Sequence, residues 1–247
     1  MNMIAVIPAR YESSRFPGKP LADICGKPMI WWVFNQVKKV NELSEVYIAT
    51  EDTRIYTECK KFGINVVMTS KEHKSVFNRI GEFANKVPAD GYVVINGDEP
   101  LIKPEHIREC IYEATDIDKY VYNAIAPIKS QAQTNDISNI KVIFDKNNTA
   151  LYMSRTPVPF PYKSMNFSYW KHVGITVLNK NYIDFYNSTE KGYLENIEGI
   201  DHLRFIEHKQ IMKFVKLEEC ETLSVDTPND LEIIKEIILR SNNENEN

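Results

Sequence analysis

The chain has 247 residues, of which 43% are hydrophobic and 26% are charged, so it is long enough and apolar enough to bury a full core. The formal net charge of -4 argues against a nucleic-acid-binding or membrane-surface protein, which would carry a basic excess. No run reaches the ~18 apolar residues of a membrane-spanning helix, the N-terminal apolar run is too short for a signal peptide, and the 4 cysteines have no metal-binding spacing. We therefore predict a cytoplasmic protein, because scattered unpaired cysteines suit a reducing compartment.

Predicted strands and helices alternate through the first half of the chain. Short apolar runs predict strands at residues 4–7, 46–49, 64–68, 92–95 and 120–124. Helices are expected at residues 28–39, 52–62 and 76–87, with a further helix after Pro104. Strands that alternate with helices of about ten residues predict a parallel sheet with right-handed crossovers.

The pattern changes in the second half. Strands predicted at residues 140–143, 151–154 and 172–177 are joined by loops, which indicates an antiparallel extension of the sheet. Helices near Tyr182 and Ile200, a strand at 211–215 and a final helix from Pro228 to about Arg240 follow. We expect one Rossmann-like α/β domain over residues 1–240, with a mixed, mainly parallel sheet flanked by helices, and a disordered polar tail over residues 241–247.

A basic loop follows the first predicted strand. Arg10, Arg15 and Lys19 fall within ten residues at the carboxyl end of that strand, where open α/β sheets bind ligands. Gly18 and the prolines beside it allow a sharp turn, so that backbone N–H groups can face an anion. Arginine and lysine side chains bind phosphate oxygens, and the loop is therefore a candidate phosphate site. The alternative is a solvated basic loop without a ligand.

Two acidic residues are candidate metal ligands. Asp98 follows the strand at 92–95, separated from it by Asn96-Gly97, and Asp226 follows Leu223-Ser-Val225, which we predict to be a strand end. Mg²⁺ takes one or two carboxylates together with phosphate oxygens. For Asp226 the sequence alone favours a cap of the last helix, since aspartate before Thr-Pro caps well. Glu99 is left open between a second acidic contact and a turn residue.

Further motifs continue along the chain in a characteristic order. They are the loop from Pro8 to Leu21, Gly26-Lys-Pro-Met-Ile30, Ala49-Thr-Glu-Asp52, Met68-Thr-Ser with His73 and Ser75, Asn96-Gly-Asp-Glu-Pro-Leu-Ile102, Leu151-Tyr-Met-Ser-Arg155, Lys171-His-Val-Gly-Ile175 and Val225-Asp-Thr-Pro-Asn-Asp-Leu231. Together these motifs resemble the 3-deoxy-manno-octulosonate cytidylyltransferases, the CMP-Kdo synthetases. The resemblance covers residues 3 to about 236, nearly the whole chain.

The resemblance implies a magnesium-dependent enzyme of the nucleotidyltransferase fold that is a homodimer. An anomeric hydroxyl of an acidic sugar would attack the α-phosphate of CTP, and pyrophosphate would leave. Asp98 and Asp226 would hold Mg²⁺, which reverses the preference for a helix cap at Asp226. The implied catalytic residues are Arg10, Arg15, Lys19 and Asp98. The implied nucleotide-binding residues are Pro8, Ala9, Arg10, Lys19, Ser75, Arg79 and Gly97, with Ser75 and Arg79 at the cytosine.

The acceptor side departs from the family pattern. The implied acceptor-binding residues are Asn96, Arg155, His172, Asp201 and His202. Asn96 stands where the family has glutamine, Asp201-His202 stands for Glu-Gln, and Val76 replaces a glycine. Changed side chains at hydrogen-bonding positions alter specificity strongly. We therefore expect Kdo itself to be a poor acceptor beside an amino-substituted Kdo, another ulosonic acid or a smaller acid. The alternative is neutral variation.

Two other classes of function compete with this interpretation. A metal-dependent nucleotide-sugar glycosyltransferase would commonly carry Asp-X-Asp, whereas this chain has Gly97-Asp98-Glu99 and a basic loop that such an enzyme does not need. A non-catalytic nucleotide-binding protein would not need the intact set of Arg10, Arg15, Lys19, Asp98 and Asp226.

Overall fold

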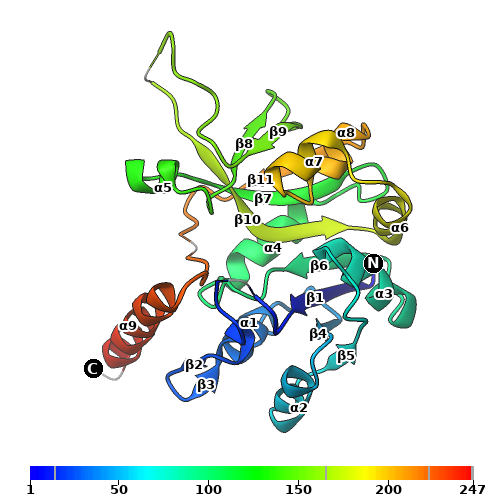
Figure 1. The fold of residues 1–247 in the computed structure, drawn as a ribbon, viewed down its shortest axis with the longest axis vertical. Coiled ribbons are helices and arrows are strands. Elements are labelled where there is room, and N and C mark those ends of the chain that lie inside the picture. Colours follow the sequence, from blue (N-terminus) through cyan, green and yellow to red (C-terminus); the bar gives the residue numbers. More distant parts are fainter. Residues whose placement is uncertain (14, 165, 222, 246–247) are drawn as a thin grey trace.

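The computed structural model of the protein describes residues 1–13, 15–164, 166–221 and 223–245, the last five without their side chains. Within these residues a single nine-stranded sheet forms the centre of the molecule (Figure 1). Its main path runs in the order β11 (Met212–Lys216), β7 (Val121–Pro127), β10 (Trp170–Leu178), β6 (Gly91–Ile95), β1 (Met3–Ala9), β4 (Glu45–Thr50) and β5 (Val66–Met68). Strand β8 (Lys141–Phe144) pairs with β10 and with β9 (Ala150–Ser154).

The sheet combines parallel and antiparallel pairs. Strands β6, β1, β4 and β5 run parallel, and so do β7 and β11. Strand β10 lies antiparallel between β6 and β7, and β8 and β9 add an antiparallel extension. The predicted Rossmann-like, mainly parallel sheet with an antiparallel extension is confirmed.

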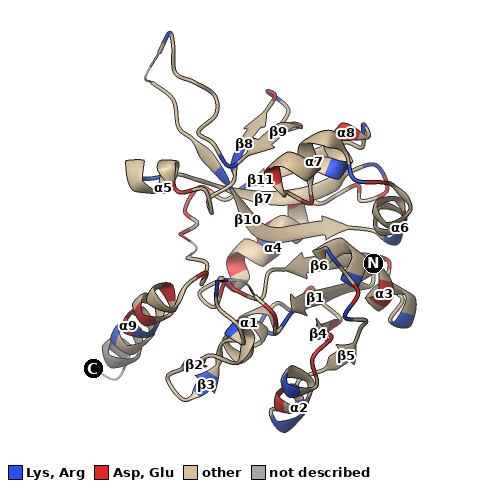
Figure 2. Cartoon of the chain, in the orientation of Figure 1, with Lys and Arg blue, Asp and Glu red and all other residues tan. Residues whose placement is uncertain are grey.

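Helices cover both faces of the sheet, because alternate residues of its central strands point to opposite faces. In β1, Ala5 and Ile7 join the core beneath α1 (Met29–Val37), α2 (Thr53–Lys61) and α4 (Pro104–Glu113), whereas Ile4 and Val6 join the opposite core. That second core includes buried residues of α3 (Val76–Lys86), α6 (Lys180–Ser188) and α8 (Leu203–Glu207). Figure 2 shows charged residues mixed over the outer helices, while β1 and β6 are largely free of charge.

A third, smaller core positions the C-terminal part of the site. Helix α9 (Pro228–Asn245) lies beside the short hairpin of β2 (Asp23–Ile24) and β3 (Lys27–Pro28) (Figure 1). Ile24, Met29, Val225, Leu231 and Ile234 are buried together there. The apolar face of α9 therefore fixes Val225, and with it the neighbouring Asp226, next to the first loops of the chain.

Several predicted elements differ from the structure. Residues 223–225 form no strand, since Val225 makes only a single backbone bond, from its N–H to the carbonyl of Asp98 (2.8 Å). Ile200 lies between α7 (Tyr193–Glu198) and α8, because Gly199 with a φ of 63° ends α7. The last helix continues past Arg240 to Asn245, where we had expected a disordered tail, and residues 246 and 247 lie outside the described residues. The hairpin β2–β3, the 3-10 turn Lys19–Leu21 and α5 (Gln131–Asn135) were not predicted.

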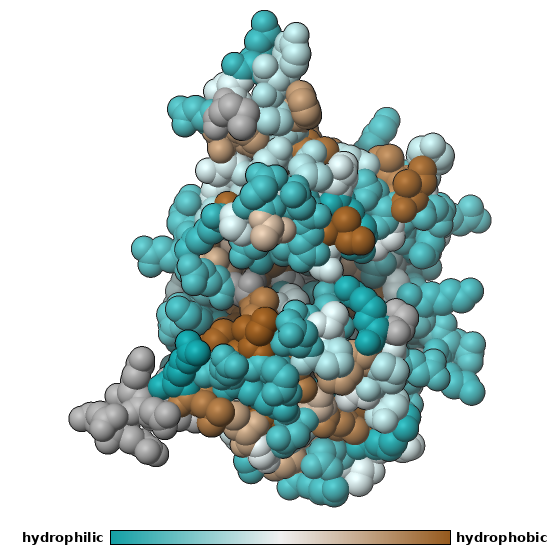
Figure 3. Space-filling model, turned by 60° about the vertical axis from the view of Figure 1, so that its left-hand side comes forward, coloured by the Kyte–Doolittle hydropathy of each residue, from teal (hydrophilic) through white to brown (hydrophobic). Residues whose placement is uncertain are grey.

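The surface adds two observations. In the described part of the chain, no helix is long and apolar enough to cross a membrane. On the face drawn in Figure 3, hydrophobic residues form separate patches within a mostly hydrophilic surface.

Candidate active site

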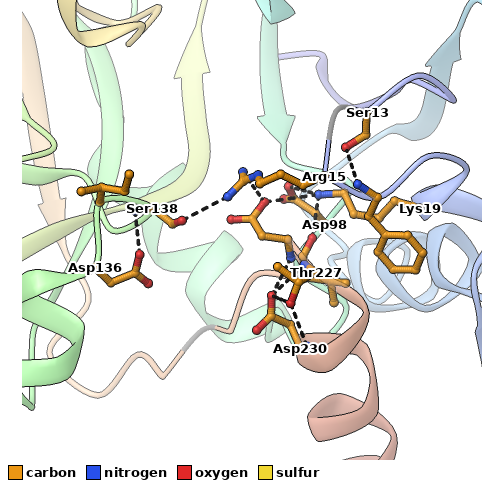
Figure 4. Close-up of polar contacts among 12 residues, drawn as sticks. Ser13, Arg15, Lys19, Asp98, Asp136, Ser138, Thr227 and Asp230 are labelled. Carbon is orange, nitrogen blue, oxygen red and sulfur yellow. Dashed lines mark hydrogen bonds and ion pairs between the residues drawn. The ribbon is translucent and has the colours of Figure 1, made fainter.

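The basic loop leaves β1 and folds back at Gly18. Gly18 has a φ of 73°, and a Cβ there would lie 3.0 Å from the Tyr11 hydroxyl, so the turn requires glycine. Its N–H donates to the Tyr11 carbonyl (2.8 Å), which closes the loop. The turn carries Lys19 into the centre of the site, where its Nζ donates to Asp98 Oδ2 (2.9 Å) and to the Val225 carbonyl (2.6 Å). Figure 4 shows Arg15 and Lys19 reaching toward Asp98 from this loop.

Asp226 joins the same cluster from the far end of the chain. Its Oδ1 accepts from Arg15 Nη2 (2.8 Å) and lies 3.6 Å from Lys19 Nζ. Arg15 also donates to Ser138 Oγ (3.2 Å), on the loop before β8 (Figure 4). Segments separated by more than a hundred residues thus converge on one group of two carboxylates and two cations.

The interpretation of Asp226 as a helix cap is wrong. The Asp230 carboxylate accepts from the backbone N–H groups of Asp226 (3.0 Å) and Thr227 (2.8 Å) and from the Thr227 hydroxyl (2.9 Å). Asp230, in the first turn of α9, therefore forms a capping box with Thr227, whose hydroxyl accepts in return from the Asp230 N–H (3.4 Å). The Asp226 side chain is left to face the basic loop.

The carboxylates of Asp98 and Asp226 fit a magnesium ion. An oxygen of each lies within 3.6 Å of Lys19 Nζ, so both reach the same point in space. Asp98 Oδ1 is buried and has no hydrogen-bond partner among the described residues, which leaves a lone pair for a ligand. The described residues contain no group of three or more His, Cys, Asp or Glu that could hold a metal. Two carboxylates that need further oxygens from phosphate are the set that Mg²⁺ accepts.

Three neighbouring cavities hold all of the site residues predicted from the sequence. The first, about 460 Å³, is lined by Pro8, Ala9, Arg10, Arg15, Lys19, Arg79, Gly97, Asp98 and Asp226. The second, about 370 Å³, is lined by Ser75, Phe77, His172, Thr176, Asp201 and His202. Arg10, Val76 and Asn96 line both, so the two cavities adjoin. The third, about 170 Å³, is lined by Arg155, Asn96, Asp98, Glu99, His172 and Asp226.

The residues expected at the cytosine already have partners within the protein. Arg79 is 1% exposed and forms an ion pair with Glu51 (2.7 Å) and a hydrogen bond to Thr69. Ser75 Oγ caps α3 by accepting from the Asn78 N–H (3.1 Å). The part of Ser75 and Arg79 in cytosine recognition stays a prediction.

Gly97 is required by backbone packing. A Cβ there would lie 3.0 Å from the Pro8 carbonyl oxygen, so the strand ends of β1 and β6 pack too closely for any side chain. This contact sets the floor of the first cavity, which both residues line.

Neutral and charged polar side chains both line the second cavity, with Lys74, Lys191, Glu195 and Asp201 among the charged ones. His202 Nε2 lies 2.9 Å from Thr176 Oγ1, and burial together with the nearby His172 lowers the pKa of His202 well below its usual value. Burial lowers the pKa of His172 to about 4, against the opposing effect of Asp98. Asp201 Oδ2 accepts from the Val76 N–H (3.1 Å), and burial raises the pKa of Asp201.

Arg155 and Arg204 both bond to other groups of the protein. Arg155 donates to the carbonyls of Glu198 (2.8 Å), Ile137 (2.9 Å) and Gly199 (3.3 Å). Arg204 is buried and pairs with both oxygens of Glu195 (2.7 Å each). Arg155 therefore braces the wall of the third cavity, and its contact with an acceptor stays a prediction.

Glu99 lies inside the protein rather than in an exposed turn. Its Oε1 accepts from the Gly174 N–H (3.0 Å), and burial, together with the neighbouring Asp98, raises the pKa of Glu99 to about 7. Because Glu99 also lines the third cavity, it connects the carboxylate pair to β10.

Comparisons with known proteins identify the family of the chain. A model of the cytidylyltransferase family matches residues 4–240. The chain belongs to the cytidylyltransferase family. The resemblance to 3-deoxy-manno-octulosonate cytidylyltransferases seen in the motifs is thereby confirmed at the level of relatives as well.

Individual cytidylyltransferase relatives match along nearly their whole length. An 8-amino-3,8-dideoxy-manno-octulosonate cytidylyltransferase from Shewanella pealeana is 39% identical over 240 residues, covering 94% of this chain and 97% of the relative. A 3-deoxy-manno-octulosonate cytidylyltransferase from Leptospira interrogans is 40% identical over 237 residues, 95% of each chain. A solved structure of CMP:2-keto-3-deoxy-manno-octonic acid synthetase complexed with CTP superposes with a TM-score of 0.91 at 34% identity, covering 98% of this chain and all of that one.

Sequence reasoning missed two polar residues of this cytidylyltransferase site. Thr176 lines the second cavity, and Asn123, buried in β7, contacts His172. A polar asparagine inside the predicted apolar strand at 120–124 was the available signal, because buried polar groups require a partner. Its partner on β10 is 49 residues away, so the sequence did not identify it.

Proposed function

We propose that this enzyme transfers CMP from CTP to an acidic sugar of the Kdo type and releases pyrophosphate. The observation that carries the proposal is the convergence of Arg15, Lys19, Asp98 and Asp226 in a cavity that adjoins a second cavity lined by many hydrogen-bonding side chains. The first suits a triphosphate, and the second suits a sugar. Relatives of the same length bear names of this activity.

Charge neutralisation and positioning account for the chemistry. Arg10, Arg15 and Lys19 would bind the phosphates and stabilise the negative charge that develops on the leaving pyrophosphate. Arg15 and Lys19 would exchange some of their contacts with the carboxylates for phosphate oxygens. Asp98 and Asp226 would hold Mg²⁺, which supplies positive charge at the α-phosphate and lowers the pKa of the attacking hydroxyl.

The function is tested by incubating the protein with CTP, Mg²⁺ and Kdo-type acids while measuring pyrophosphate and the CMP-sugar. Both products are expected in equal amounts, with loss of turnover when EDTA removes the metal. ATP and GTP are expected to be poor donors in the same assay. Failure to form a CMP-sugar from any acid in the panel would contradict the proposal.

The acceptor we favour is the amino sugar named for the Shewanella relative, 8-amino-3,8-dideoxy-manno-octulosonate. The second cavity contains the partly buried carboxylate of Asp201 together with two uncharged histidines, and an ammonium group on the sugar would add to the positive charge that Lys191 supplies to this carboxylate. We expect kcat/KM at least tenfold higher for the amino sugar than for Kdo, a difference of about 1.4 kcal/mol. Equal or better use of Kdo would show the changes at Asn96, Asp201 and His202 to be neutral.

Association and location form the remaining part of the proposal. Residues 155–164 and 166–169, called the arm below, project from the body between β9 and β10 (Figure 1). Phe160 and Tyr162 on the arm are 81% and 82% exposed, which a second copy of the chain would cover. We infer a homodimer formed through the arm. A cytoplasmic location, predicted from the cysteine pattern, is the setting in which CTP is available.

A further inference from the structure

A buried asparagine contacts one of the histidines of the second cavity, His172. Asn123 lies in β7 and is 1% exposed. Beside it, the pairing of β7 with β10 shifts register between His172 and Thr176, so the backbone ladder is interrupted there. The Asn123 Nδ2 donates to the carbonyls of Ile175 (2.9 Å) and Val173 (3.2 Å). The side chain thus supplies the donors that the irregular strand would otherwise lack.

These contacts fix the orientation of the amide. If the side-chain amide were turned over, its oxygen would face two carbonyl oxygens, and buried acceptors would repel one another. The Asn123 Oδ1 must therefore face His172 Nδ1, which lies 2.9 Å away. An amide oxygen only accepts hydrogen bonds, so Nδ1 of His172 carries the hydrogen.

The opposite edge of the imidazole is then defined as well. Because burial lowers the pKa of His172 to about 4, the ring is neutral near pH 7 and holds one hydrogen, at Nδ1. Nε2 consequently has a lone pair. No hydrogen bond of Nε2 is present among the described residues, and His172 lines the second and third cavities.

We propose that Asn123 is a positioning residue for the acceptor: it holds His172 in the Nδ1-protonated tautomer, so that Nε2 accepts a hydrogen bond from a hydroxyl or ammonium group of the sugar. This inference rests on the proposed function. A buried, uncharged acceptor strengthens the binding of a ligand that has a hydrogen-bond donor at this place. It weakens the binding of a ligand that has an acceptor or an anion there. Specificity at this point therefore depends on a residue that does not touch the ligand.

The tautomer is tested directly, without substrate, by nitrogen-15 NMR of protein labelled in histidine. His172→Gln identifies the signals of His172. The wild-type spectrum is expected to show hydrogen on Nδ1 and none on Nε2. Asn123→Leu, which removes the acceptor, is expected to move His172 toward the Nε2-protonated form. Hydrogen on Nε2 in the wild type would overturn the proposal, and so would an unchanged tautomer in a folded Asn123→Leu protein.

Kinetics provide the second measurement. Asn123→Leu is expected to raise KM for the acceptor by roughly tenfold or more, the effect of one hydrogen bond to a buried group, with little change in KM for CTP. Asn123→Asp keeps an acceptor for Nδ1 but places its second oxygen against the Val173 and Ile175 carbonyls, so it is expected to keep hydrogen on Nδ1 while lowering the melting temperature. The matched control is Asn179→Ala, which removes a buried asparagine that caps α6 and lies outside the cavities. It should lower the melting temperature without changing KM for the acceptor.

The two proposals fail in different ways. If no acid is turned over while His172 shows the expected tautomer, the proposed function is wrong and Asn123 has positioned His172 for another ligand. If turnover is normal and Asn123→Leu leaves KM for the acceptor unchanged, the positioning role is wrong and the proposed function stands.

Discussion

Lys19 connects three parts of the site through one ammonium group. Its Nζ contacts Asp98, the Val225 carbonyl and Asp226, and its side chain is only 14% exposed. Arg15 contacts the Asp226 carboxylate from a more exposed position, with 55% of its side chain accessible. We therefore expect the stability of the fold to depend more on Lys19 than on Arg15.

Arg15→Ala is expected to lower turnover by roughly tenfold or more with a change of less than about 0.5 kcal/mol in stability, since an exposed ion pair contributes little. Lys19→Ala is expected to lower turnover further and also to lower the melting temperature, because Asp98 and Asp226 would lose the cation between them. Steady-state rates per folded molecule and thermal melts separate the two effects. Lys61→Ala, which breaks an exposed ion pair with Glu58 on α2, is the control. If Arg15→Ala alters only stability, the loop is structural.

Asp226→Asn tests the metal assignment. Turnover should fall by at least about a hundredfold while the fold is kept, since asparagine is a poor magnesium ligand and the helix cap belongs to Asp230. Asp98→Asn should behave in the same way. Asp230→Ala is the contrast, expected to cost about 1 kcal/mol of stability through the lost cap, with a smaller effect on rate. Near-normal turnover of Asp226→Asn would remove Asp226 from the metal site.

At the scale of single residues, sequence reasoning located those candidate site residues whose placement follows from their position in the chain. Arg10, Arg15, Lys19 and Asp98 come directly after strands, and strand ends meet at one edge of the sheet. It favoured Asp226 as the cap of α9 and did not identify the capping box of Thr227 and Asp230. Nor could it find Asn123, whose partners lie on a strand about fifty residues away.

Among the elements, the arm is the one with least support from the body of the protein. Phe160→Ser with Tyr162→Ser is expected to convert a dimer into a monomer at micromolar concentration, because the change removes the largest exposed apolar side chains of the arm. Sedimentation velocity measures the result. Tyr193→Ser, at a residue 76% exposed on α7, should leave association unchanged. A wild-type protein that is monomeric at every concentration would contradict the inferred dimer.

The predicted elements agree with the structure where local pattern determines them. Strands β1, β4 and β6 and helices α2 and α3 lie within about two residues of their predicted bounds, because buried apolar runs and the caps at Asp52 and Ser75 are local signals. The position of β10 between β6 and β7 was not predicted, since strand pairing depends on contacts between distant parts of the chain. The apolar residues Leu223 and Val225 led to the prediction of a strand at 223–225. In the structure, these two side chains pack in the third core instead.

For the molecule as a whole, the buried histidines predict sensitivity to acid. Above pH 6.5 His172 and His202 are neutral in both the folded and the unfolded chain. As the pH falls below 6.5 the unfolded chain binds a proton at each ring, whereas folded His172 stays neutral to about pH 4 and the pKa of His202 is also well below 6.5. The contribution of these two histidines to stability should therefore be complete above pH 6.5 and decrease by about 1.4 kcal/mol per pH unit for each such proton as the pH falls, whereas Glu99, with its pKa raised to about 7, acts in the opposite direction.

The measurement is the free energy of unfolding in urea between pH 7 and pH 4.5. His202→Gln is expected to reduce the dependence of the unfolding free energy on pH by the contribution of one proton, because glutamine does not titrate. His208→Gln, at an exposed histidine, should leave the slope unchanged. Equal slopes in the wild type and His202→Gln would show that His202 is protonated in the folded state.

The third core has a consequence for how activity arises during synthesis. The nine-stranded sheet ends at Lys216, before Asp226 has been added to the chain, so a ribosome can release every strand of the sheet while the active site still lacks one of its two carboxylates. Helix α9 then docks on the β2–β3 hairpin and delivers Asp226. A chain truncated before Asp226 would keep the basic loop and most of its core, yet we expect it to be inactive. On the proposed role of Asp226, only chains that include α9 would consume CTP.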